Sequence, residues 1–248
     1  MYELSFQHHN RPVNRPIPTN CISSGFSLVV VRFHFFWIIH LADALFAILI
    51  DCGFITKKIH AKAGRNASAA DVCDECDRIC KSELLKRYEL LRIYYYDAPP
   101  SSESIEYPIS KQRLSLAQTQ RYRDNKSLHD QLALKDNFAL RMGETRLSPT
   151  KWKIKPRIQK ELIKTPRALL DSDFDLDINQ KGVDLRIGLD MARLALNDRV
   201  RAIVVVTGDS DFIPAFKFVR REGLKIILDS MGHNVRNELR IHSDIVLS

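Results

Sequence analysis

Short apolar runs that alternate with helical segments constrain the fold of this 248-residue chain most strongly. Residues 45–50 and 203–206 are unbroken apolar runs, which is typical of buried strands in a parallel sheet covered on both faces. Residues 91–96 form a β-rich run that stops at Pro99 and Pro100. Further strands are expected at 138–142, 225–228 and 244–247. Strands that alternate with helices predict an α/β fold with a parallel sheet and right-handed crossovers.

Helical spacing marks the segments between these strands. Val183, Ile187, Met191 and Leu194 share one face of a helix expected over 183–196. Other helices are expected over 71–90, from 127 onward, over 212–221 and over 234–241. Residues 101–126 are polar and rich in serine, and they predict an insertion that forms a mobile loop or a ragged helix.

The composition is that of a globular protein, with 45% hydrophobic and 27% charged residues. It argues against a disordered chain, a collagen-like fibre and a polytopic membrane protein. The 38 basic residues outnumber the 30 acidic ones and give a net charge of +8, which suits a polyanionic partner. Five cysteines are too few and too unevenly placed for a secreted disulfide framework, so we expect a reducing compartment and a cytoplasmic location.

The N-terminal part differs from the rest of the chain. Residues 26–50 could span a bilayer by length, but Arg, His and Asp residues interrupt them, at Arg32, His34, His40 and Asp43. An Arg or Asp at mid-membrane costs roughly 2.5–3.5 kcal/mol. Ala42-Asp43-Ala44 resembles a signal cleavage site, yet the preceding arm is long and only weakly basic. We expect residues 1–44 to be an N-terminal extension and expect no stable membrane association.

Aspartates follow the apolar runs. Asp51 ends the first run, Asp209 and Asp211 follow the run at 203–206, and Asp184 opens the helix before it. Chemistry in open α/β sheets gathers at the carboxyl ends of the strands, and converging carboxylates suit Mg²⁺ or Mn²⁺. The same aspartates could instead cap helices or turns. The chain has no Gly-x-x-x-x-Gly-Lys-Ser/Thr or Gly-x-Gly-x-x-Gly motif, which disfavours a nucleotide-triphosphate motor or a dinucleotide enzyme.

Four segments resemble the NYN domain, a family of PIN-like nucleases, in its LabA-like branch. They are residues 48–54 (ILIDCGF), 94–100 (YYYDAPP), 181–184 (KGVD) and 207–212 (TGDSDF). The resemblance covers roughly residues 45–248. It implies a PIN-like Rossmannoid three-layer fold with a mainly parallel central sheet. It also implies that 45–248 is one domain, with the polar insertion near 101–126 and a basic segment at 151–167.

The resemblance also implies a metal-dependent ribonuclease pocket. Asp51, Asp184 and Asp209 would bind Mg²⁺ or Mn²⁺, and Asp211 would be a ligand or hold the attacking water. Thr207 and Ser210 would support the pocket through hydrogen bonds. The implied function is an RNA endonuclease that hydrolyses phosphodiester bonds.

Two departures from the family pattern favour a different function. Cys52 replaces the usual Gly after the first Asp, and Phe54 and Ile55 occupy the region of an expected Asn. They favour a catalytically weak or inactive module that binds RNA or a regulatory partner. A phosphatase that acts on a small phosphate is a third hypothesis.

Residues 151–167 carry seven Lys or Arg and one Glu. This segment could hold an RNA backbone and stack Trp152 on a base, or it could be a solvated loop. The predicted RNA contacts are Lys151, Trp152, Lys153, Lys155 and Arg157. Acidic residues follow at 171–177, as a solvated loop or a cation site. We also allow for a homo-oligomer.

Several smaller patterns remain. Cys73, Cys76 and Cys80 fit a zinc or iron–sulfur motif, but on a helix they would share one face and pack as small apolar residues. The tyrosines at 94–96 are expected to alternate between core and surface. Asp244 could approach the carboxylate pocket from the last strand.

Overall fold

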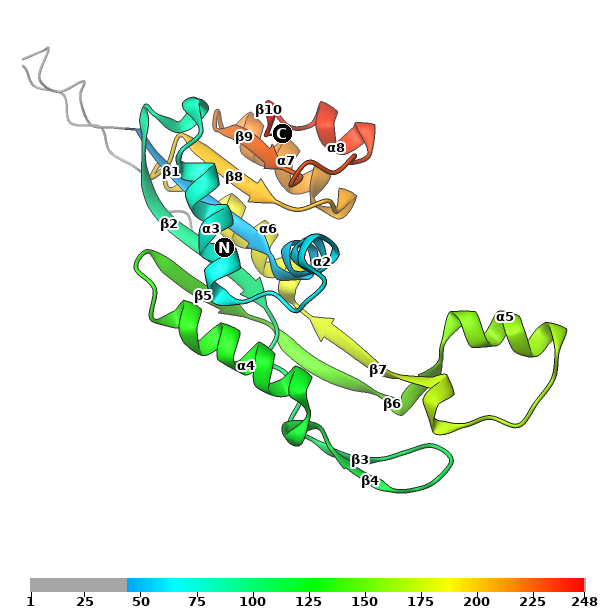
Figure 1. The fold of residues 1–248 in the computed structure, drawn as a ribbon. Coiled ribbons are helices and arrows are strands. Elements are labelled where there is room, and N and C mark those ends of the chain that lie inside the picture. Colours follow the sequence, from blue (N-terminus) through cyan, green and yellow to red (C-terminus); the bar gives the residue numbers. More distant parts are fainter. Residues whose placement is uncertain (1–43, 248) are drawn as a thin grey trace, which may run out of the picture. The chain divides into compact units, whose positions relative to one another are not determined.

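A computed structural model describes residues 44–247, so the expectations for residues 1–43 lie outside the described part of the chain. Its centre is a six-stranded sheet in the order β10-β9-β8-β1-β2-β5 (Figure 1). Every neighbouring pair in this sheet is parallel. The strands are β1 (Ala44–Asp51), β2 (Tyr88–Asp97), β5 (Phe138–Met142), β8 (Ala202–Val206), β9 (Lys225–Asp229) and β10 (Ile245–Leu247). The predicted α/β fold with a parallel sheet is confirmed.

Helices cover both faces of this sheet. Alternate residues of β1 face opposite cores: Ile48 and Ile50 pack with helices α2, α3 and α4, whereas Ala47 and Leu49 pack with α6, α7 and α8. Figure 1 shows these groups on opposite sides of the sheet. The helices are α2 (Cys52–Ala63), α3 (Ala69–Cys80), α4 (Gln120–Ala133), α6 (Val183–Leu196), α7 (Ile213–Arg221) and α8 (Asn237–Ile241). The fold is therefore the expected three-layer arrangement.

Both faces of the sheet are buried under helices, and this corrects the expectation for the tyrosines at 94–96. Tyr95 and Tyr96 are both fully buried, each in a different core, and Tyr94 packs partly against the second core. Successive residues of a strand point to opposite faces. Because both faces are covered here, the predicted alternation between core and surface is wrong, and the side chains alternate between two cores.

An antiparallel ribbon leaves the sheet after β5. It consists of β6 (Glu144–Ile154) and β7 (Phe174–Lys181), with α5 (Pro156–Lys164) and the short helix η3 (Asp171–Asp173) between them. The predicted loops at 151–167 and 171–177 are thus largely strand and helix. Their charged side chains pair across the ribbon, as in Lys153–Asp177 at 3.2 Å. Charge pairing replaces the apolar alternation that would have marked these strands in the sequence.

The polar insertion is also more ordered than expected. A hairpin of β3 (Ser104–Glu106) and β4 (Arg113–Ser115) is followed by the short helix η2 (Leu116–Gln118), and α4 begins at Gln120. The indole N–H of Trp152 donates to the carbonyl of Glu106 at 2.8 Å, so the hairpin is tied to the ribbon. Partners distant in sequence explain why the segment by itself looked like a loop.

The first charged helix is shorter than the predicted 71–90. Ser68 and Asp71 form a capping box at the start of α3, and the helix ends at Cys80, followed by the short helix η1 (Glu83–Leu85). Cys76 is buried, and Cys73 and Cys80 pack against the same core. All three thiols are free. They pack as small apolar residues, as the helical alternative predicted.

Candidate functional site

The candidate site lies at the carboxyl ends of β1 and β8. Ile50 of β1 is in register with Val206 of β8, so the residues that follow them are neighbours. The hydroxyl of Thr207 donates to Oδ2 of Asp51 at 3.1 Å. The backbone N–H of Asp209 donates to that same hydroxyl oxygen at 3.1 Å. Thr207 thus links the first and third of the predicted site aspartates.

Two of these aspartates also cap helices. Asp51 Oδ1 accepts the backbone N–H of Phe54 at 3.3 Å, at the start of α2. Asp209 Oδ1 accepts the N–H of Asp211 at 2.9 Å, at the start of the short helix η4 (Ser210–Phe212). The capping and site interpretations of the sequence are therefore compatible. Capping fixes the directions in which these carboxylates point.

Asp184 reaches the site from the base of the ribbon, where β7 returns to the sheet and leads into α6. It lies in the first turn of α6, after Gly182, whose φ of 74° is in the left-handed region. Asp51, Asp184 and Asp209 line one hollow of about 480 Å³ together with Ser210. Asp211 does not line it but raises the pKa of Asp184 by repulsion. The geometry thus brings three of the four predicted carboxylates to a common space.

Burial and mutual repulsion shift the proton affinities of this cluster. Burial is the largest cause of the raised pKa of Asp51, and the charges of Asp184 and Asp209 add to it. The pKa of Asp184 is also raised, first by burial and then by Asp209 and Asp211. Hydrogen bonds from Thr207 and Phe54 act in the opposite direction at Asp51.

The donor chemistry of the hollow fits a hard divalent cation. All three lining carboxylates offer oxygen donors, which Mg²⁺ and Mn²⁺ prefer. None of the ion pairs within residues 44–247 involves Asp51, Asp184 or Asp209. Within the same residues, however, no three or more His, Cys, Asp or Glu side chains lie in an arrangement that could hold a metal ion. The carboxylates share a space without forming a closed ligand set.

Basic side chains that sequence reasoning missed share this hollow. Lys57 and Lys58 come from α2, and His233 and Arg236 from the segment before α8. Arg236 Nη1 donates to the hydroxyl of Ser210 at 3.2 Å. Because α2 starts at the capping residue Asp51, Lys57 and Lys58 lie within two turns of it. That spacing is the signal that could have identified them.

The predicted RNA contacts of the basic segment lie elsewhere, on the ribbon and α5. Lys153 pairs with Asp177 at 3.2 Å, and Lys155 lies 3.9 Å from Asp175. Trp152 stacks on Tyr107. Lys151 and Arg157 belong to β6 and α5. Of these five predicted contacts, none lines the hollow that holds the carboxylates.

A buried polar network behind Asp51 was also missed. Asp97, at the end of β2, accepts the Cys52 thiol at 3.0 Å and contacts His129 Nε2 at 2.7 Å. Its other oxygen accepts the N–H of Ala98 and the amide of Gln180. Burial alone would raise the pKa of Asp97, but these hydrogen bonds hold it below its ordinary value. Asp97 also ends a strand, which was the available signal.

Cys52 points into this network and away from the hollow. It is the first residue of α2, is 6% exposed, and accepts the hydroxyl of Tyr95 at 3.0 Å. Its thiol therefore helps to join α2 to β2. The departure from Gly at this position leaves the space beside Asp51 open.

Asp244 does not approach the site. It precedes β10 and accepts Arg220 Nε at 2.9 Å and the N–H of Ile226 at 2.8 Å. The start of a parallel strand lies at the edge opposite to the carboxyl ends, so the expectation for Asp244 is wrong. Asp229, at the carboxyl end of β9, is paired with Arg78 instead.

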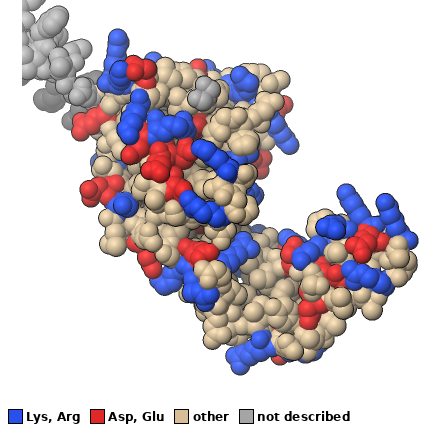
Figure 2. Space-filling view, viewed as in Figure 1, with Lys and Arg blue, Asp and Glu red and all other residues tan. Residues whose placement is uncertain are grey.

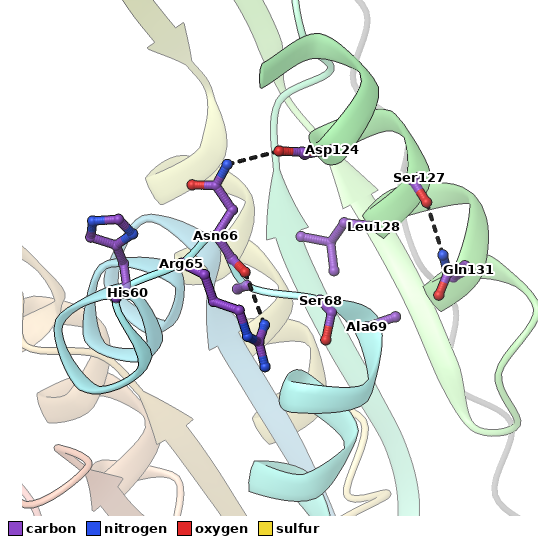
Figure 3. Close-up of a pocket in the computed structure, with 11 residues that line it drawn as sticks. His60, Arg65, Asn66, Ser68, Ala69, Asp124, Ser127, Leu128 and Gln131 are labelled. Atoms are coloured by element: carbon purple, nitrogen blue, oxygen red, sulfur yellow. Dashed lines mark hydrogen bonds between the residues drawn. The ribbon is translucent and has the colours of Figure 1, made fainter. Parts of the chain in front are cut away.

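A second hollow, of about 560 Å³, lies between the α2–α3 connection and α4 (Figure 3). Its polar groups largely satisfy one another. Asn66 Nδ2 donates to Asp124 at 2.8 Å, and Arg65 pairs with Asp71 at 2.7 Å. It shares no lining residue with the carboxylate hollow. Its internal pairing gives it no evident ligand.

Comparison with known proteins places the chain in a family. The model of the NYN domain matches residues 46–244. An uncharacterized protein of Methanocaldococcus jannaschii is 31% identical over 80 residues, and this match spans 32% of the chain and 33% of that relative. A crystal structure of a protein of unknown function from Vibrio parahaemolyticus aligns over 83% of this chain and 94% of that one, with 15% identity and a TM-score of 0.46.

No helix within residues 44–247 combines the length and apolar character needed to cross a bilayer.

The LabA-like branch of the family stays a prediction. The family match covers most of the chain. It includes β2, β5, β8 and β9 in full and all of β1 except its first two residues, and it ends just before β10. The chain therefore belongs to the NYN domain family, a PIN-like family of nucleases.

Proposed function

We propose that this protein is a divalent-metal-dependent RNA endonuclease. One observation carries the proposal: Asp51, Asp184 and Asp209, from three separate segments, line one hollow together with Lys57, Lys58 and Arg236. Carboxylates suit a metal ion, and basic side chains suit the phosphates of a nucleic acid. A hydrolase acting on RNA needs both in one place.

Asp51, Asp184 and Asp209 would hold Mg²⁺ or Mn²⁺, and Asp211 would be a further ligand or hold the attacking water. When bound, such an ion polarises a phosphoryl group and lowers the pKa of a bound water. Thr207 fixes Asp51 through its hydroxyl and orients Asp209 through the backbone. Ser210, held by Arg236, supports the same turn.

The basic residues of the hollow would bind the RNA backbone on both sides of the scissile phosphate. Lys57 and Lys58 would contact one phosphate from α2, and Arg236 another from the segment before α8. Their positive charges offset the charge that grows on the phosphate oxygens during hydrolysis. The predicted contacts on the ribbon, Lys151 to Lys155 and Arg157, would bind RNA away from the point of cleavage.

Cleavage of an end-labelled pool of single-stranded and hairpin RNA tests this proposal. The assay compares Mg²⁺, Mn²⁺ and EDTA for wild type, Asp209→Asn and the matched control Asp74→Asn, which changes an exposed acid of α3. We expect metal-dependent cleavage in wild type and control, and RNA binding without cleavage in Asp209→Asn. Equal cleavage by all three proteins would indicate a contaminating nuclease. Hydrolysis of a small phosphate ester that added RNA does not inhibit would support a phosphatase instead.

A non-cleaving RNA-binding module is the second candidate function. The observation that favours it is the lack of a closed metal-ligand group within residues 44–247. This function predicts RNA binding that weakens with salt and no turnover under any metal condition.

A further inference from the structure

A third hollow, of about 670 Å³, lies between the β3–β4 hairpin and the distal part of β6. It shares no lining residue with the carboxylate hollow. The two segments that form it are far apart in the sequence, because η2, α4, β5 and the start of β6 lie between them. Its walls combine aromatic and basic side chains, namely Tyr107, Trp152, Lys111, Arg113 and Lys151.

The aromatic wall is held in a fixed orientation. The rings of Tyr107 and Trp152 stack with centroids 5.3 Å apart and planes at 23°. The indole N–H of Trp152 donates to the carbonyl of Glu106 at 2.8 Å, and the N–H of Tyr107 donates to the carbonyl of Gln112 at 3.0 Å. Both rings remain partly exposed. A ring that is already oriented loses little freedom when a planar ligand stacks on it.

The basic wall carries charges that are not used in ion pairs. Lys153 and Lys155, on the same strand, have aspartate partners across the ribbon. Within residues 44–247, Lys111, Arg113 and Lys151 form no such pair; Lys111 is near enough to Asp171 to contribute to its lowered pKa. The hollow therefore keeps three cations against the single carboxylate of Glu106.

The backbone adds a second, independent observation. Lys111 has a φ of 58° and Lys151 a φ of 63°, both in the left-handed region that residues with side chains seldom adopt. Lys151 lies where the pairing of β6 with β7 shifts register. Strained residues of this kind persist where surrounding structure enforces them, and they cluster at ligand sites. Both lysines line the same hollow as Tyr107 and Trp152.

We infer that this hollow is a second nucleotide-binding site, which stacks a base of single-stranded RNA on the Tyr107–Trp152 pair and holds its phosphates with Lys111, Arg113 and Lys151. The inference rests on the proposed RNA function and deepens it. An unpaired base has a free planar face, whereas the bases of a duplex are stacked inside it. An acidic peptide would match the cations but would leave the aromatic wall without a planar partner.

The neighbouring α5 helix supplies a matched control surface. Figure 2 shows Lys and Arg side chains projecting from the surface that α5 forms in Figure 1. Lys160 and Lys164 of α5 are exposed and do not line the hollow. Replacing both removes the same amount of positive charge as replacing Lys111 and Arg113, but from outside the hollow.

Tryptophan fluorescence provides a direct test. The other Trp of the chain, Trp37, is replaced by Phe, so that the fluorescence comes from Trp152. The full chain is then titrated in EDTA with a short oligouridylate. We expect saturable quenching of Trp152. The double variant Lys111→Gln/Arg113→Gln should lower the slope of log affinity against log salt by about 1.4, at about 0.7 for each lost phosphate contact. The control Lys160→Gln/Lys164→Gln should keep the wild-type slope.

A stacking variant separates base from phosphate recognition. In calorimetric titrations, which do not need the Trp152 signal, Trp152→Leu should weaken oligouridylate binding about tenfold, as loss of one stacked base does, whereas Trp152→Phe should keep most of the affinity. Circular dichroism of each variant checks that the ribbon is still folded. If Trp152→Leu does not fold, the fluorescence titration with the charge variants decides the question alone.

Three outcomes would overturn the inference. Oligouridylate could bind without quenching Trp152, the two double variants could weaken its binding equally, or oligoglutamate could quench Trp152 as strongly as oligouridylate does. The readout needs no metal and no cleavage, so it is separate from the test of the proposed nuclease. Quenching without cleavage by any metal would leave this site standing and reject the nuclease. Cleavage that Asp209→Asn abolishes, without quenching, would reject this site alone.

Discussion

The hydroxyl of Thr207 donates a 3.1 Å hydrogen bond to Asp51 Oδ2 and so joins the carboxyl ends of the adjacent strands β8 and β1. Thr207 is fully buried, and its oxygen also accepts the N–H of Asp209. One side chain therefore fixes the positions of two proposed metal ligands. Outer-shell partners of this kind typically contribute 10- to 100-fold, in rough terms, to metal affinity.

Thr207→Val should weaken Mn²⁺ binding by about 10- to 100-fold, because both aspartates lose their common partner. Thr207→Ser keeps the hydroxyl and should bind Mn²⁺ nearly as wild type does. Calorimetric titration of the metal measures both affinities, and thermal unfolding shows whether the variants fold. Equal Mn²⁺ affinities for the Val and Ser variants would refute the positioning role of the hydroxyl.

Asp51→Asn should make the metal-free protein more stable at neutral pH. The folded-state pKa of Asp51 is raised above its ordinary value of 3.8, so the folded state binds its proton more tightly than the unfolded state does. The stability from this group is full below pH 3.8 and is lost as the pH rises through the folded-state pKa. Asn cannot ionise, yet it can still cap α2.

Thermal unfolding of both proteins against pH measures this difference. For a chain of this size, each kcal/mol corresponds to a melting temperature shift of about 2–4 °C. The two curves should converge below pH 3.8, and Mn²⁺ should stabilise wild type more than Asp51→Asn. A variant that is less stable than wild type at every pH would contradict the interpretation of Asp51 as a buried, repelled carboxylate.

Sequence patterns were sufficient for the central sheet and the carboxylates that its strands carry. Short continuous apolar runs are typical of buried parallel strands, and Asp51 and Asp209 lie at or just beyond the points where two of these runs stop. The ribbon could not be predicted in the same way, because its strands are joined by ion pairs such as Lys153–Asp177 and not by an alternating apolar face. Its pairing joins residues distant in sequence, which a local pattern does not reveal.

The basic residues of the site were missed for a related reason. The densest positive charge lies at 151–167, yet in that segment Lys153 and Lys155 are paired with aspartates of β7. Lys57 and Arg236 are far apart in the sequence and line one hollow only because α2 and the segment before α8 reach the same edge of the sheet. Local charge density therefore did not identify the residues nearest the carboxylates.

His129→Leu should destabilise the fold by about 1–3 kcal/mol, because Asp97 is buried and would lose its contact with His129 Nε2. Hydrogen bonds hold the pKa of Asp97 below 3.8, so its contribution to stability is present above pH 3.8 and is lost as the pH falls through the folded-state pKa. In His129→Leu this acid-side loss should begin at a higher pH.

Urea unfolding at several pH values measures both effects. His129→Gln restores a donor and should recover part of the lost stability, while the exposed control His60→Leu should leave the acid-side profile unchanged. Equal stability losses for His129→Leu and His129→Gln would mean that packing, and not the contact with Asp97, accounts for the role of His129.

Gly143→Ala should destabilise the base of the ribbon. A Cβ at Gly143 would lie 2.6 Å from the backbone carbonyl oxygen of Lys181 and 2.9 Å from Val183 Cγ2. Because the nearer atom belongs to the backbone, relief requires β6 and β7 to separate where β7 leads into Asp184. We expect a loss of about 1–3 kcal/mol in stability, as overpacking produces, together with weaker Mn²⁺ binding.

Gly188→Ala is the matched control for this change. Gly188 lies inside α6, and a Cβ there would meet nothing within 4 Å. The substitution should stabilise the protein by up to about 1 kcal/mol, since Ala favours the helix more than Gly does. Urea unfolding and Mn²⁺ titration of both variants test the pair. If Gly143→Ala matched Gly188→Ala in both measurements, the close approach of the ribbon strands would not be what positions Asp184.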